Sequence, residues 1–165
     1  MRALLTRLHH LWLGLRLLPG LLANANQRRL LAEMRALSCQ LPAILKQPIP
    51  QAMRQIEIMA LERPYSLPPE NKTRQLADLA ALLDRHSPQG LCLRRSLLRY
   101  RYLYELNVPV TVLFGAKFAP GEKTNVKKIL GHAWLVRGGR PYHEDDKNWQ
   151  GYTVMLCWPE REIGD

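Results

Sequence analysis

Apolar residues recur every three to four positions through roughly the first two thirds of the chain, which is the spacing of amphipathic helices. The clearest repeat follows Gly90 and comprises Leu91, Leu93, Leu97, Leu98, Tyr102 and Leu106. We expect this helix to end near Asn107, and we expect others at about 2–18, 26–41, 51–62 and 71–85. Pro19-Gly20 is predicted to end the first of them.

The last third of the chain has a different pattern, with short β-branched stretches bounded by Pro, Gly and polar residues. We expect strands at about 108–115, 129–136, 140–144 and 153–158, with Gly138-Gly139 as a tight hairpin turn. Helices followed by an antiparallel meander define an α+β fold. We predict a helical N-terminal region over residues 1–70 and a second domain over 71–165, in which one helix packs on a small antiparallel sheet.

Composition narrows the class of protein only partly. The chain has 165 residues, 47% of them apolar, so it is long enough to bury a core. Its 24 Lys and Arg against 14 Asp and Glu leave a net charge of +10, which attracts nucleic acid, an anionic membrane or an acidic peptide without choosing among them. Cys39, Cys92 and Cys157 match neither a disulfide framework nor a zinc ribbon, so the reducing cytoplasm is the expected compartment.

A leucine-rich segment opens the chain and is followed by Ala23-Asn24-Ala25, which resembles a signal-peptidase site. Arg7, two histidines and Arg16 interrupt that segment. A secretory core needs about 7–15 unbroken apolar residues, and a membrane-spanning helix about 20. We therefore expect a basic amphipathic helix that packs on the domain, with contact to a membrane surface as the alternative.

Cys92 lies in the first turn of the helix predicted after Gly90. The positive end of a helix dipole stabilises a thiolate, which is the nucleophilic form of cysteine. The alternative is that Cys92 is a small core residue, as free cysteines in apolar helices usually are.

His132 is the candidate base for this thiol. Alternation along the strand 129–136 places it on one face with Leu130 and Trp134. The predicted hairpin would bring Glu144 and Asp145 beside the same strand, where a carboxylate can orient an imidazole. A satisfied core histidine is the alternative, and the pattern leaves both open.

Taken together, these motifs resemble a transglutaminase-like or papain-like cysteine enzyme. More narrowly, Cys92-Leu93-Arg94-Arg95-Ser96-Leu97, Leu106 to Val110, Gly131-His132-Ala133-Trp134 and Gly139-Arg140-Pro141 are similar to the leader peptidase of lasso-peptide biosynthesis, often called the B protein. The resemblance covers about residues 91–146.

The resemblance implies hydrolysis of a leader from a ribosomally made precursor peptide. It implies Cys92 as nucleophile and His132 as base. Family members usually have an Asp where Glu144 falls, and Asp145 follows one residue later, so the third position stays open between them. No cofactor or metal is implied, and the chain has no phosphate-binding glycine loop.

The resemblance also implies partners. The N-terminal half has the apolar spacing of helices, and we recognise no strand-rich leader-recognition domain in it. The chain therefore resembles the form of the family in which leader recognition is carried out by a separate protein. That form works with a separate leader-recognition protein and an ATP-dependent macrolactam synthetase, and we expect no nucleic-acid partner. Two other hypotheses are a basic adaptor without catalysis, which binds peptide, RNA or membrane, and an acyl transferase of transglutaminase-like fold.

Overall fold

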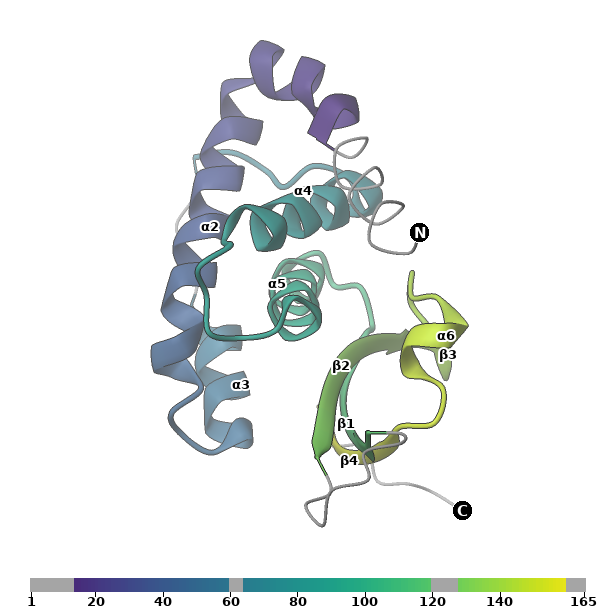
Figure 1. The fold of residues 1–165 in the computed structure, drawn as a ribbon. Helices are drawn as coiled ribbons and strands as arrows, with labels where there is room; N and C mark the ends of the chain where they lie inside the picture. Colours follow the sequence, from purple (N-terminus) through teal and green to yellow (C-terminus); the bar gives the residue numbers. More distant parts are fainter. Residues whose placement is uncertain (1–13, 60–63, 120–127, 160–165) are drawn as a thin grey trace. The chain divides into compact units, whose positions relative to one another are not determined.

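The computed structural model describes residues 14–59, 64–119 and 128–159. The chain forms two compact units, Met1–Val108 and Pro109–Asp165, and each is described by itself. The first is helical and the second contains a four-stranded antiparallel sheet (Figure 1), so the α+β prediction is confirmed. The predicted domain division at residue 70 stays a prediction; the compact units divide after Val108.

The first unit begins, within the described residues, with a helix over 14–23. The rest of the helix predicted at 2–18 lies outside those residues. Its predicted end at Pro19-Gly20 is wrong, because the helix continues to residue 23. The break comes at Asn24, whose side-chain oxygen accepts the N–H groups of Asn26 and Gln27 at 2.9 and 3.2 Å and so caps the next helix.

Four further helices lie in the described part of the first unit. They are α2 (Ala25–Ile44), α3 (Ile49–Ile58), α4 (Glu70–Leu83) and α5 (Leu91–Glu105). Prolines mark two of the helix starts, since Pro48 and Pro69 are the N-caps of α3 and α4. The helix predicted at 26–41 is longer than expected, because α2 runs on to Ile44 with Pro42 inside it.

The core of the first unit lies where α2, α4 and α5 pack together (Figure 1). Fully buried apolar side chains come from all three helices, including Leu30, Met34, Leu76, Leu97 and Leu103. Burial of a leucine side chain contributes about 1.5–3 kcal/mol, so these contacts are a large favourable contribution to the stability of the unit.

Three arginines of α5 are also buried. Arg94, Arg99 and Arg101 are 6%, 4% and 4% exposed. Arg99 makes a two-pronged ion pair with Asp78 of α4, at 2.5 Å from Nε to Oδ1 and 2.8 Å from Nη2 to Oδ2. A buried charge is tolerated only when it is paired and hydrogen-bonded, so this ion pair ties α5 to α4.

The described residues of the second unit form β1 (Thr111–Phe118), β2 (Ile129–Arg137), β3 (Arg140–Pro141), the short helix α6 (Asp146–Trp149) and β4 (Thr153–Trp158). The strand order is β3-β2-β1-β4, with every pair antiparallel. The predicted meander is therefore wrong for the last strand, because β4 returns to pair with β1. This is the strand order of a Greek key.

The hairpin between β2 and β3 forms where it was predicted. Gly138 and Gly139 have φ values of +56° and +77°, a left-handed backbone that glycine adopts without steric cost. The strand predicted at 140–144 is only two residues long, because His143 also has a positive φ of +49° and turns the chain away from the sheet.

Among the described residues, no helix has both the length and the hydropathy needed to cross a lipid bilayer.

We predict that Asp78→Asn lowers the free energy of unfolding by about 3–5 kcal/mol, because it removes a negative charge that pairs with the buried Arg99 guanidinium. Urea denaturation followed by circular dichroism measures this loss. Asp145→Asn makes the same chemical change at an exposed position and is the matched control, with an expected loss below about 0.5 kcal/mol. Equal losses in both variants would show that the ion pair has no special role.

Candidate functional site

Cys92 is the second residue of α5 and is half-buried. Gly90 is the N-cap of the helix and has no side chain to accept the N–H groups of the first turn. Those N–H groups therefore stay available to a negative charge at the helix start, as does the positive end of the helix dipole. The thiol belongs to the first unit.

The loop before Cys92 is held by Arg94. Its guanidinium donates to the backbone carbonyl of Asp84 and lies 3.5 Å from the Asp84 carboxylate. The same carboxylate accepts a hydrogen bond of 2.8 Å from Ser38 of α2. Because α4 ends beside Asp84, these contacts tie the start of α5 to the end of α4 and to α2.

His132 lies in β2 of the second unit and packs against two aromatic rings, Trp134 and Tyr152, whose own centroids are 6.4 Å apart. Its imidazole stacks on Trp134 with 5.6 Å between ring centroids and 18° between planes, and it lies 5.2 Å from the ring of Tyr152. The side chain is 10% exposed. Contact with both rings of this cluster restricts the imidazole to a narrow range of orientations.

Gly115 of β1 makes this packing feasible. It pairs with His132 across the sheet, and a Cβ atom built on it would lie 2.9 Å from the Trp134 ring and 3.1 Å from the carbonyl of Thr153. Both distances are shorter than an ordinary carbon contact. A β-bulge between Phe114 and Gly115 lies at the same point of the β1–β4 ladder.

Glu144 is the carboxylate that faces the imidazole. Its Oε1 lies 3.8 Å from His132 Nε2, and its side chain is 1% exposed. Oε1 also accepts a hydrogen bond of 2.8 Å from the side-chain amide of Asn148 in α6. The carboxylate is thus held from α6 while it faces β2.

Asp145, the other candidate for the third position, is exposed and is the N-cap residue of α6. Its backbone carbonyl accepts the N–H of Asn148 at 2.9 Å. The left-handed backbone at His143 sets which of the two acidic residues turns back toward β2, and Glu144 is the one that does.

The structure therefore brings His132 and Glu144 together within the second unit, and it places Asp145 at a helix start. Cys92 lies in the first unit, so its pairing with His132 stays a prediction. Two residues that contact this group, Tyr152 and Asn148, were not identified from the sequence. The four-residue helix that carries Asn148 is too short to produce a periodic pattern.

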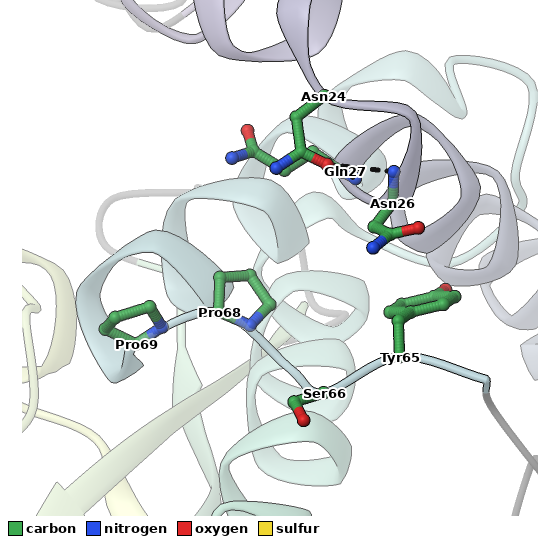
Figure 2. A pocket seen from close by; sticks show the side chains of 7 residues that line it. All are labelled: Asn24, Asn26, Gln27, Tyr65, Ser66, Pro68 and Pro69. Carbon is green, nitrogen blue, oxygen red and sulfur yellow. Dashed lines mark hydrogen bonds between the residues drawn. The ribbon is translucent and has the colours of Figure 1, made fainter.

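A separate cavity of about 300 Å³ lies in the first unit (Figure 2). Its lining comes from the start of α2 and from the segment before α4, namely Asn24, Asn26, Gln27, Tyr65, Ser66, Pro68 and Pro69. The cavity contains none of the predicted site residues.

In the part of the chain that the structure describes, no three or more His, Cys, Asp or Glu side chains are grouped so as to hold a metal ion.

Comparison with known proteins places the chain in a family. The profile of the transglutaminase-like superfamily matches residues 6–157, which is most of the chain. The chain therefore belongs to the transglutaminase-like superfamily, a class that includes cysteine peptidases and acyl transferases. No curated protein and no solved structure shows significant similarity to the chain.

We predict that Gly115→Ala lowers the free energy of unfolding by about 1–3 kcal/mol, because the new methyl group displaces the Trp134 ring. The displacement should also change the NMR signals of the His132 ring. Gly131→Ala is the control in the neighbouring strand, since a Cβ at that position meets nothing within 4 Å. If the His132 signals are the same in both variants, the Trp134 ring does not set the position of the imidazole.

Proposed function

We propose that this protein is a cysteine peptidase that removes the leader from a ribosomally made precursor peptide during the maturation of a lasso peptide or a related product. The observation that carries the proposal is the imidazole of His132 facing the buried carboxylate of Glu144, in a transglutaminase-like chain that also has a cysteine at a helix start. The motifs around Cys92 and His132 support the leader-peptidase assignment by resemblance.

The reaction assigns one role to each group. The Cys92 thiolate attacks the carbonyl carbon of the last leader residue, and the C–N bond breaks as imidazolium His132 protonates the departing amine. A thioester remains on Cys92. Water then attacks this thioester, His132 takes the proton of the water, and the leader acid and the free thiol are released.

The orientation of His132 determines which nitrogen serves the thiol. Nε2 faces Glu144 at 3.8 Å, so Nδ1 is the atom that exchanges a proton with Cys92. The Glu144 carboxylate stabilises the imidazolium form and fixes the tautomer. Catalytic hydrogen bonds are often long in the absence of substrate, and we expect this separation to shorten on binding.

The first turn of α5 supplies the oxyanion site. The backbone N–H of Cys92 lies at the helix start, where Gly90 provides no capping side chain. A negative oxygen that develops on the attacked carbonyl can accept this N–H, and each such donor contributes about 10²–10³ in rate.

The proposal includes partners. The precursor peptide is the substrate, a separate leader-recognition protein presents it, and an ATP-dependent macrolactam synthetase acts on the released core peptide. The same catalytic residues could also serve an acyl transferase, in which an amine replaces water. Mass spectrometry of the products distinguishes the two reactions, because hydrolysis adds the elements of water and transfer joins two chains.

We predict that Cys92→Ala abolishes cleavage of a cognate precursor and that His132→Ala lowers the rate by about 10²–10⁴. Without a precursor, the test is site-resolved alkylation at mildly acidic pH, where an ordinary thiol reacts slowly. Cys92 should react fast, and this reactivity should disappear in His132→Ala. Cys39 and Cys157 in the same sample are internal controls. Slow labelling of Cys92, unchanged in the variant, together with normal cleavage by Cys92→Ala would refute the mechanism.

We predict that Glu144→Gln lowers kcat/KM for the precursor by about 10- to 100-fold, because the amide keeps the shape of the side chain and loses the charge that stabilises imidazolium. Asp145→Asn should change kcat/KM by less than about threefold, because an exposed charge contributes little. The reverse order of effects would assign the third position to Asp145.

A further inference from the structure

Lys117 lies beside one of the aromatic rings that contact His132. The Nζ atom of Lys117 lies 4.0 Å from the centroid of the Tyr152 ring, within the range of a cation–π contact. The same ring lies 5.2 Å from the His132 imidazole. Tyr152 therefore contacts both the proposed base and a positive charge.

Lys117 and His132 also lie on the same face of the sheet. In the β1–β2 ladder Gly115 is opposite His132 and Lys117 is opposite Leu130, so both side chains leave the sheet on one side. Residues in this diagonal relation are about 7–8 Å apart at Cα, which is within reach of a long side chain. A substrate residue next to the scissile bond would thus meet the ammonium group as well as the imidazole.

The charge of Lys117 is not neutralised within the described part of the chain, where no carboxylate lies at ion-pair distance from it. Glu144, the carboxylate that faces His132, already accepts a hydrogen bond from Asn148. The Tyr152 ring holds the ammonium group in place and leaves its N–H groups able to bind an incoming anion.

We propose that Lys117 and Tyr152 form a subsite for an acidic side chain of the substrate, within a few residues of the bond that is cleaved. The inference rests on the proposed peptidase function and adds the class of substrate, a peptide with Asp or Glu near the cleavage point. The Lys117 ammonium group accounts for the preference for a negatively charged substrate residue. The Tyr152 ring holds that ammonium group in position.

The test compares cleavage of a peptide library of mixed sequence, read by mass spectrometry, for the wild-type chain and three variants. Lys117→Glu reverses the charge, Lys117→Met keeps an apolar stem against Tyr152, and Lys128→Glu reverses an exposed charge elsewhere in the same unit. The wild type and Lys128→Glu should cut about fivefold better next to Asp than next to Asn. Lys117→Met should lose this preference, and Lys117→Glu should favour Lys or Arg. An acidic preference that is absent, or present in all four proteins, overturns the subsite.

A second measurement decides the subsite without catalysis. Acetyl-Ser-Asp-Ser-amide and acetyl-Ser-Asn-Ser-amide are titrated into the full-length chain while NMR follows the rings of Tyr152 and His132. Only the acidic peptide should shift these signals, and only when Lys117 is present. If no library peptide is cleaved, this titration alone supports or refutes the anion subsite, and cleavage of a cognate precursor tests the peptidase proposal. Equal shifts with both peptides refute it.

Discussion

The burial of charge in α5 is the constraint on which the first unit depends. Arg94, Arg99 and Arg101 are nearly inaccessible, and each needs an acceptor in a fixed place. Arg99 meets Asp78 of α4, Arg94 meets Asp84 at the end of α4, and Arg101 meets Glu105 and the carbonyl of Met59. Apolar packing alone would let α5 slide or rotate, whereas directional pairs select one register. The helix start that carries Cys92 is positioned by the same pairs.

In the second unit, the contacts described above hold the imidazole of His132 in one orientation. Trp134 and Tyr152 pack on His132, and the space for the Trp134 ring exists because Gly115 has no side chain. The Glu144 carboxylate faces Nε2 of His132, and its Oε1 accepts a hydrogen bond from the side-chain amide of Asn148. These residues come from β1, β2, α6 and the segments on either side of α6, so the orientation of His132 depends on several parts of the second unit. A catalytic base needs such support, because a small error in its position costs much of the rate.

The sequence could not determine whether Glu144 or Asp145 faces His132. The two residues are adjacent and chemically alike, and in a regular strand their side chains would point to opposite faces. The chain is not a regular strand at this point, since His143 has a left-handed backbone and β3 ends at Pro141. A positive φ is uncommon even for histidine, so the strand 140–144 and the register of its acids could not be read correctly from the pattern.

The sequence by itself determined the class of fold, the helix that carries Cys92, the hairpin at Gly138-Gly139 and the strand face shared by His132 and Trp134. These features depend on local periodicity and on residues with strong backbone preferences, which act over a few positions. The tertiary structure alone decided that β4 pairs with β1, that three arginines of α5 are buried, and that Glu144, Asn148, Tyr152 and Gly115 gather at His132. Contacts between residues far apart in the chain leave no periodic trace, because they are set by packing and by the pairing of buried polar groups.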